Sequence, residues 1–226
     1  MKEINYKVKN SIFIIFVTLF ITSCLNYNQV TTIKTDNSGK MFIHYWMAMD
    51  PDLDSLLITK IGLFSPENLT ENFTASFTKL NYANTYHDFT DSTLHAQIEF
   101  EFTDFDSLNL LSFFKHSELS IKEGPEDTKI FSQFIQPITT TFGLSEKNYN
   151  ISYVYYLPGN IIKHNANSLS RNKLEWNFTL DDIGNGKTIS ATFIPFKLKE
   201  TPIWIYTLAS IVILIVLVFL FKKGKK

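Results

Sequence analysis

An uninterrupted apolar run near the end of the chain constrains the fold of this sequence more than any other feature. The run Ile203–Phe221 contains no charged side chain, and four lysines follow it. At a rise of about 1.5 Å per residue, the run matches a hydrocarbon core of about 30 Å. Trp204 and Tyr206 lie at its start, where aromatic rings favour the interface, and the lysines fit the positive-inside rule. The pattern predicts a transmembrane helix over residues 202–221 and a cytoplasmic basic tail over residues 222–226.

A second apolar run lies at the start of the chain, between a lysine-bearing beginning and the ending Ile21-Thr22-Ser23-Cys24. This order is typical of a secretory signal. The ending resembles the lipobox of bacterial lipoproteins, in which the cysteine is diacylated and becomes the new N-terminus. The resemblance implies a signal peptide over residues 1–23 and lipidation of Cys24. The alternative is a plain signal peptide or an uncleaved anchor with an incidental cysteine.

Both terminal signals predict the same orientation in the membrane. We expect residues 24–201 to form one extracytoplasmic domain at the cytoplasmic (inner) membrane, and the lysines at both ends to be cytoplasmic. Residues 24–221 hold 14 Lys and Arg against 21 Asp and Glu, a net charge of −7. An acidic surface gains nothing from counterion release on a phosphate backbone, so nucleic acid is not an expected partner. Cys24 is the only cysteine, which excludes an internal disulfide.

The composition and the local patterns of the central region predict a folded domain rich in strands. Hydrophobic residues make up 45% and aromatic residues 15% of the chain, enough for a packed core. A β-hairpin is expected over residues 30–47 around Asp36-Asn37-Ser38-Gly39, with Gly39 available for a positive φ. Apolar and polar residues alternate in further segments, which predicts half-buried strands over residues 93–102, 149–157 and 173–180 and around Ile189, Ala191 and Phe193.

Helix signals separate some of these strands. Ser65-Pro66-Glu67 offers a capping hydroxyl, a proline at the first helical position and an acid in the first turn. Leu69, Phe73 and Phe77 then recur on one helical face. Two further helices are expected, over residues 52–59 and after Asp104. Together the patterns predict an α+β fold, in which two or three helices pack on one face of an antiparallel sheet, plus the C-terminal transmembrane helix.

The last third of the domain contains a series of four short segments. They are a strand ending in Pro-Gly, a short Asn-containing stretch, a strand bearing Trp and a closing strand with a small residue: Tyr156-Leu157-Pro158-Gly159-Asn160-Ile161, Asn165-Ala166-Asn167, Leu174-Glu175-Trp176 and Ile189-Ser190-Ala191. In this series the domain over residues 24–201 resembles the LppM-domain lipoproteins of bacteria. Those proteins commonly pair a lipobox with a C-terminal spanning helix, so the resemblance extends over most of the chain. It implies an α+β domain on the outer face of the cell membrane, with lipid or glycolipid binding suggested for the mycobacterial member. This chain is rich in Lys and Asn, unlike actinobacterial proteins, so the ligand is not carried over.

No arrangement of residues in the sequence predicts a catalytic or metal site. The five histidines (His44, His87, His95, His116 and His164) are scattered and lack the spacing of a zinc helix. The sequence Gly184-Asn185-Gly186-Lys187-Thr188 lacks the first glycine of a phosphate-binding loop, so we expect a hairpin turn there. Asp50, Asp52 and Asp54 lack the glycine and glutamate of a calcium-binding loop. We therefore expect no enzyme, no cofactor and no metal.

Two hypotheses for the function remain open. In the first, the domain binds a lipid or glycolipid, with an apolar cleft lined by Trp46, Tyr153, Tyr155 and Trp176. In the second, it is a non-catalytic structural or interaction subunit of a cell-envelope complex. A cavity of several hundred cubic ångströms would favour the binding domain, and a solid core with an exposed apolar patch would favour the interaction subunit.

Overall fold

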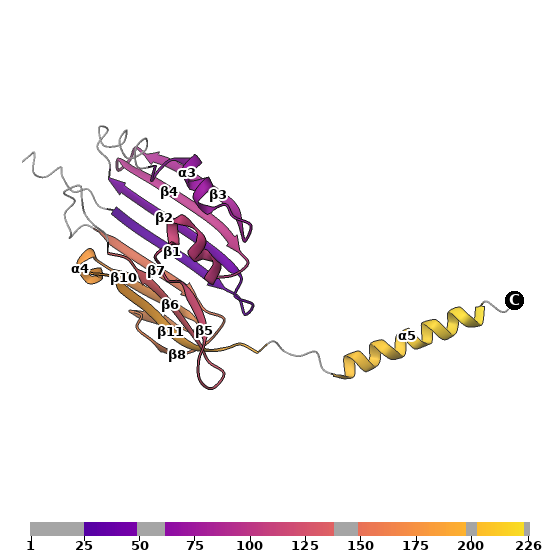
Figure 1. Ribbon diagram of the computed structural model, residues 1–226. Helices are drawn as coiled ribbons and strands as arrows, with labels where there is room; N and C mark the ends of the chain where they lie inside the picture. The colour runs from indigo at the N-terminus through magenta and orange to yellow at the C-terminus, as the bar shows by residue number, and fades with distance from the viewer. Residues whose placement is uncertain (1–24, 49–61, 138–148, 198–202, 224–226) are drawn as a thin grey trace, which may run out of the picture. The chain divides into compact units, whose positions relative to one another are not determined.

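A computed structural model describes residues 25–48, 62–137, 149–197 and 203–223 of the chain. Cys24, the signal peptide and the helix expected over residues 52–59 lie outside the described residues. The chain divides into two units, Met1–Pro195 and Phe196–Lys226. The first unit contains two β-sheets, and the second contains the helix α5 (Ile203–Lys223), as Figure 1 shows.

The larger sheet has seven strands in the order β3-β4-β2-β1-β7-β10-β9. Its strands are β1 (Leu25–Ile33), β2 (Gly39–Ala48), β3 (Thr78–Asp88), β4 (Thr93–Phe102), β7 (Asn150–Tyr156), β9 (Ser168–Ser170) and β10 (Lys173–Phe178). Neighbouring strands are antiparallel except β1 and β7, which pair in parallel through the middle of the sheet.

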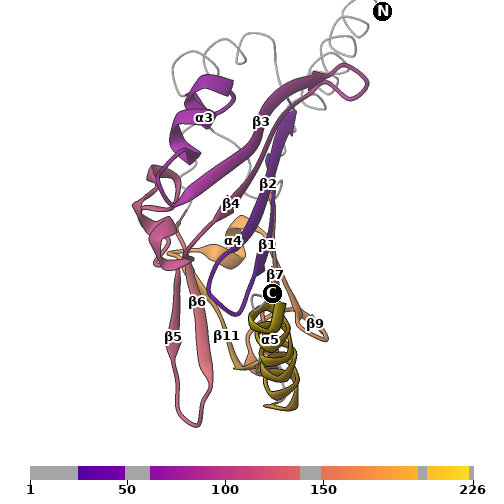
Figure 2. The same ribbon diagram turned by 90° about the vertical axis from the view of Figure 1, so that its right-hand side faces the viewer.

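The smaller sheet has four strands in the order β5-β6-β11-β8, all antiparallel. Its strands are β5 (Ser120–Glu123), β6 (Lys129–Ile135), β8 (Gly159–His164) and β11 (Lys187–Pro195). Figure 2 shows this sheet on the same side of the larger sheet as the helix α3 (Pro66–Phe73) and two 3₁₀ turns, η2 (Asp106–Leu110) and η3 (Ser112–Phe114). The other face of the larger sheet points away from them.

The expected α+β class is wrong, because the domain is mainly β. The described residues of the first unit form eleven strands in two sheets and only two short α-helices, α3 and α4 (Leu180–Ile183). The sequence patterns did not indicate β3, β5, β6, β8 or β9. The smaller sheet, and not a layer of helices, packs against β7 and β10 of the larger sheet. The expectation of a purely antiparallel sheet is also wrong, because β1 and β7 are parallel.

The predicted hairpin of β1 and β2 is confirmed, and its turn explains the local sequence. The Asp36 carboxylate accepts hydrogen bonds from the Ser38 backbone N–H at 3.0 Å and from the Ser38 hydroxyl at 2.7 Å. The positive φ, 64°, belongs to Asn37 and not to Gly39. Glycine is needed at position 39 because β1 and β2 lie close together there: a Cβ on residue 39 would lie 2.2 Å from the Thr32 carbonyl oxygen. Any larger residue at this position would push the two strands apart.

The predicted helix start at Ser65 is also confirmed. Its hydroxyl accepts a hydrogen bond from the Asn68 backbone N–H, and Leu69 and Phe73 are buried. The helix ends at Phe73, so Phe77 lies outside it and precedes β3. The segment after Asp104 forms 3₁₀ turns and not an α-helix.

The segment between β10 and β11 is not the hairpin turn that its glycines predicted. The two strands belong to different sheets, and α4 with the following glycines carries the chain from one sheet to the other. Thr179 and Asp182 form a capping box at the start of α4. This crossover places β11 in the smaller sheet.

Aromatic rings fill the space between the two sheets. Phe131 of β6 contacts Tyr155 of β7 and Trp176 of β10, with ring centroids 4.4 Å and 6.1 Å away. All three side chains are fully buried. The Trp176 indole N–H donates to the Asn165 side-chain oxygen at 2.8 Å, so its polar atom is satisfied. These rings hold the sheets together.

A chain of buried hydrogen bonds also crosses between the sheets. Gln29 of β1 donates from its amide nitrogen to the Tyr155 hydroxyl at 2.7 Å, and this hydroxyl donates to the Gln133 side-chain oxygen of β6 at 2.6 Å. Gln29 also donates to the Thr31 hydroxyl and accepts from the Tyr27 hydroxyl. Burial raises the pKa of Tyr155, because the phenolate would be desolvated. The tyrosine therefore stays neutral and links both sheets.

The second unit is dominated by α5. Its residues Ile203–Phe221 are long and apolar enough to cross a membrane by length and composition, and their side chains are exposed in the unit. This helix agrees with the sequence prediction and is compatible with a membrane-associated protein.

Candidate functional site

The face of the larger sheet that points away from the smaller sheet carries a row of stacked rings. Trp46 of β2 and Tyr86 of β3 each pair directly with His95 of β4, and His44 of β2 lies diagonally opposite. The Tyr86 and His95 rings stack at 4.6 Å with an interplanar angle of 1°, and the Trp46 and His95 planes differ by 12°. His44 stacks on Trp46 at 4.5 Å. We call these four residues the ring row.

The ring row forms because alternation in a strand sends every second side chain to one face. Met41, Ile43, Tyr45 and Met47 of β2 are buried in the core, so the residues between them point outward. Cross-strand neighbours on one face lie about 4.5–5.5 Å apart, which suits ring stacking. Three neighbouring strands with rings in register therefore produce a continuous row.

Hydrogen bonds give the ring row a defined direction. The Asp91 carboxylate lies 2.5 Å from the Thr93 hydroxyl, and because a carboxylate only accepts, Thr93 donates to it. The same hydroxyl lies 2.7 Å from His95 Nε2, which must then be the N–H donor. His95 Nδ1 is left as an acceptor and lies 3.0 Å from His44 Nε2. The chain of donors thus runs from His44 through His95 and Thr93 to Asp91.

Both histidines of the row are held neutral near pH 7. Burial lowers the pKa of His44, and the neighbouring His95 lowers it further because two imidazolium ions would repel each other. Burial also lowers the pKa of His95, against the opposing effect of Asp91 and Asp88, while His87 adds to the lowering. A neutral row can donate and accept hydrogen bonds without attracting counterions.

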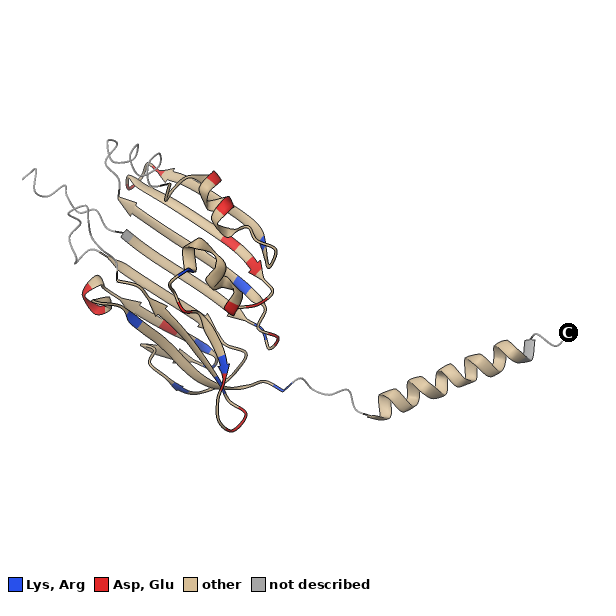
Figure 3. Cartoon of the chain, viewed as in Figure 1, with Lys and Arg blue, Asp and Glu red and all other residues tan. Residues whose placement is uncertain are grey.

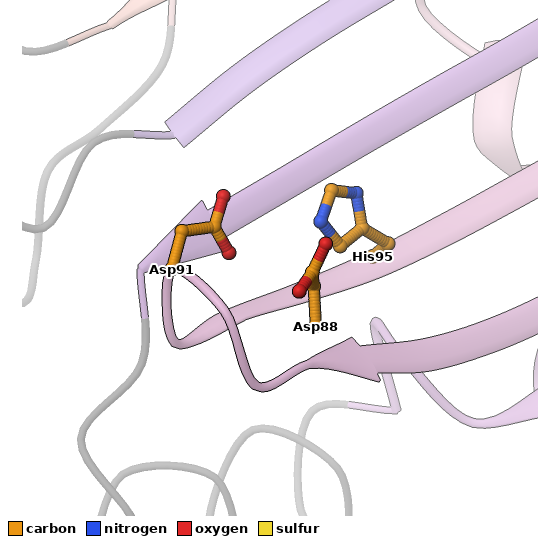
Figure 4. Close-up of side chains that lie close together, drawn as sticks. All are labelled: Asp88, Asp91 and His95. Atoms are coloured by element: carbon orange, nitrogen blue, oxygen red, sulfur yellow. The ribbon is translucent and has the colours of Figure 1, made fainter.

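The turn between β3 and β4 brings two carboxylates to His95. Figure 4 shows the side chains of Asp88, Asp91 and His95 close together. Each offers one ligand atom, and these atoms lie within 4.8 Å of one another. Carboxylate and imidazole are donors that divalent transition metals accept. Each group already has an internal partner, however: Asp88 accepts from the Thr90 backbone N–H at 2.8 Å, and the Thr93 hydroxyl bridges the other two. In this arrangement the three side chains stabilise the turn between β3 and β4 through hydrogen bonds.

Amide side chains cover the neighbouring part of the same face. Asn26 of β1 pairs with Asn150 of β7. Asn177 of β10 pairs with Ser152 of β7, which in turn pairs with Asn28 of β1. Asn150 donates to Asn26 at 3.4 Å, and Asn177 donates to Glu175 at 3.3 Å. An open depression of about 310 Å³ lies beside Asn150, Ser152 and Asn177. The face therefore combines rings with uncharged donors and acceptors.

The structure separates the four aromatic residues that the sequence suggested for a ligand cleft. Trp46 lies in the ring row on the outer face, but Tyr153, Tyr155 and Trp176 are buried in the core. The sequence did not indicate that His44, Tyr86 and His95 join Trp46. The sequence does place rings at outward positions of each strand. Which of these rings become neighbours depends on the register between the strands, and the sequence pattern does not show that register.

Comparisons with known proteins identify the fold. No protein-family profile matches the chain, and no curated protein sequence matches it. The solved structures include a similar one, the NMR structure of the folded domain of the Mycobacterium tuberculosis LppM protein. It matches with a TM-score of 0.52 and 14% identity over 81% of this chain and 96% of that domain. The chain has an LppM-like fold. This finding supports the resemblance seen in the sequence, while the α+β class attached to it is corrected to mainly β.

The histidines of the LppM-like domain predict that acid destabilises it. Unfolded histidine has a pKa of about 6.5. Because the folded pKa values of His44 and His95 are lowered, the unfolded chain binds protons first as the pH falls below about 6.5. The free energy of unfolding therefore falls with pH until the folded pKa values are passed. We expect a lower thermal unfolding midpoint at about pH 5.5 than at about pH 7.5.

A histidine variant isolates this effect from that of the carboxylates. Asp88 and Glu99 have lowered pKa values, through hydrogen bonds from Thr90 and Lys40 respectively, so their stabilisation is lost only at lower pH. His95→Asn should flatten the dependence above about pH 5.5, because it removes a histidine whose folded pKa is lowered. A wild-type midpoint that is flat across this window would contradict the prediction.

Proposed function

We propose that this protein is a membrane-anchored lipoprotein whose LppM-like domain binds the head group of a glycolipid on the outer face of its larger sheet. The LppM-like fold, the apolar helix α5 and the lipobox-like ending at Cys24 support an anchored lipoprotein. The agreement of both terminal signals on orientation supports an extracytoplasmic domain.

The ring row is the observation that carries the proposal. A saccharide presents hydroxyl groups along its edges and C–H groups on its ring faces. Tyrosine and tryptophan pair an apolar ring with a polar atom, and amides both donate and accept hydrogen bonds. The outer face offers Trp46 and Tyr86 in the row, Gln97 beside it and the asparagines along the sheet. The uncharged histidines suit a neutral, polyhydroxylated ligand.

The packing of the core favours a head group over an acyl tail as the ligand. Tyr155, Phe131 and Trp176 are fully buried against one another. An open hollow of about 670 Å³ lies at the surface beside Pro66, Glu67 and Thr74. A tail would need an enclosed apolar cavity. We therefore place the ligand on the surface.

The proposed role is binding without catalysis. Thr93 is flanked by a carboxylate and an imidazole, as a nucleophile would be, but its proton goes to Asp91 and His95 donates to it. A general base would instead have to accept the proton of the hydroxyl. The Thr93 side chain is also buried. Its hydrogen bonds thus fix the His95 ring.

Replacing Trp46 with alanine tests the proposed site. The full chain in phosphatidylcholine nanodiscs is titrated calorimetrically with hexosyl- and dihexosyl-glycerol, the deacylated head groups of simple glycolipids. We expect Trp46→Ala to weaken binding at least about tenfold, equivalent to about 1.4 kcal/mol, because a stacking ring and an indole N–H are removed.

The matched control is Leu110→Ala, which removes an exposed apolar side chain from η2, on the other side of the larger sheet. It should bind as the wild type does. Equal affinity of Trp46→Ala and the wild type would place the ligand elsewhere, and no binding of either sugar by the wild type would refute a site for simple hexosyl head groups.

An exposed phenylalanine supports the second candidate, a subunit that contacts an envelope protein. Phe89 in the turn between β3 and β4 is 86% exposed, which is unusual for a large apolar side chain. A photo-cross-linking amino acid at Phe89 should then trap one specific partner in native membranes, and the same group at Leu110 should not. Equal labelling from both positions would contradict this role.

A further inference from the structure

The outer surface of the smaller sheet carries an apolar patch that nothing described covers. Ile130 of β6, Ile162 of β8 and Ile194 of β11 are 38%, 56% and 42% exposed. We propose that this isoleucine patch rests on the lipid bilayer and orients the domain on it. The proposal rests on the membrane anchor of the proposed function and not on the glycolipid site.

Strand alternation explains why these isoleucines face outward together. Phe131 and Phe193, next to Ile130 and Ile194, are fully buried between the sheets. Ile161 packs against the core, so Ile162 points away from it at the bulge where β8 shifts register. The strands β6, β11 and β8 are neighbours. The patch therefore spans three adjacent strands on one surface.

The continuity of the chain indicates what the isoleucine patch contacts. β11 carries Ile194 and ends at Pro195, and residues 196–202 then join it to α5, the helix suited to crossing a membrane. This connector begins with the half-exposed Phe196 and with Lys197. Aromatic and lysine side chains next to a membrane span favour the interface. The end of β11 is thus joined by a short stretch of chain to the helix suited to crossing the membrane.

The distribution of charge agrees with this orientation. The described residues 25–119 contain four lysines against ten acidic residues, whereas described residues 120–197 contain seven Lys and Arg against six acidic residues. In Figure 3 acidic residues are coloured on α3 and β4 and basic residues on the smaller sheet. Lys122 and Lys163 lie on strands of the smaller sheet, flanking the patch. Anionic lipids would repel the acidic residues 25–119, but they would not repel residues 120–197, where basic residues outnumber acidic ones.

Spin labels on the full chain test the orientation. Ile162→Cys and, separately, Leu110→Cys are introduced into the Cys24→Ser background, labelled with a nitroxide and reconstituted in nanodiscs of phosphatidylcholine and phosphatidylglycerol. Both positions are exposed, so neither change should disturb folding. We expect the label at residue 162 to collide more often with oxygen, which concentrates in lipid, and several-fold less often with a water-soluble nickel complex than the label at residue 110.

Two outcomes would overturn the proposal. Equal access of the nickel complex to both labels would show that the isoleucine patch faces water. Dipolar broadening between two labels at residue 162 in one nanodisc would show that a second copy of the chain covers the patch. The readout is independent of saccharide binding, so failure of the glycolipid site would leave it unchanged. Ile194→Cys provides a second position on the patch, for which the same result as at residue 162 is expected.

Discussion

Trp176→Ala should lower the free energy of unfolding of the domain by about 3–5 kcal/mol, the largest loss expected from any substitution considered for this protein. The Trp176 side chain is fully buried between the two sheets and contacts Phe131 and Tyr155. Truncation leaves a large cavity and also leaves the Asn165 side-chain oxygen without the indole N–H. Chemical denaturation of the domain, followed by far-ultraviolet circular dichroism, measures the loss.

Trp46→Ala is the matched control, because it removes the same side chain from the outer face. Trp46 is only partly buried, so we expect a loss of less than about 1.5 kcal/mol. The two variants together distinguish a core tryptophan from a surface one. A stable Trp176→Ala protein that no longer bound saccharide would reverse the roles assigned to the two residues.

Tyr155→Phe is expected to cost about 2 kcal/mol, the second-largest effect. Its hydroxyl accepts from Gln29 and donates to Gln133, so its removal leaves buried polar atoms without this partner. An unsatisfied buried group costs about 1–3 kcal/mol. The ring and its packing stay in place, so the measured change in unfolding free energy reports the hydrogen bonds alone.

Tyr153→Phe provides the comparison for this variant. Tyr153 is also buried on β7, but its hydroxyl makes no hydrogen bond to other residues in the described parts of the chain. We expect a change of less than about 0.5 kcal/mol. Equal effects of the two substitutions would mean that the hydrogen bonds of Tyr155 contribute nothing to holding the sheets together.

The hydrogen-bond chain and the aromatic core give the LppM-like domain a rigid interior, and the two proposed surfaces lie outside it. The ring row is on the larger sheet and the isoleucine patch is on the smaller one. Because the two surfaces share no residue, variants of Trp46 and Ile162 separate ligand binding from membrane contact. This separation is the practical consequence of the two-sheet architecture.

Local patterns in the sequence were sufficient for several elements. Alternation identified β4, where Ile98 and Phe100 are fully buried and Glu101 is exposed. The capping residues at Ser65 identified the start of α3, and the absence of charge identified α5. These features depend on near neighbours, because a strand or helix needs its apolar residues at a fixed period to bury one side.

The elements that were missed lack such a local signal. β3 contains a bulge between Leu80 and Tyr82, which shifts the alternation by one residue and hides the period. β5 has only four residues. Without these strands, the helix signals suggested an α+β domain. The smaller sheet forms by pairing of strands that are distant in the sequence, and the pattern within one segment does not indicate such pairing.

Short stretches of sequence predicted the apolar helix, the hairpin of β1 and β2 and the inward face of the main strands, because each is encoded within a few residues. The parallel pairing of β1 with β7, the division into two sheets and the burial of Trp176 but not of Trp46 became visible only in the folded domain. Likewise the ring row exists only because strand register places Trp46 and Tyr86 beside His95. Register depends on contacts between distant segments, and local periodicity does not contain that information.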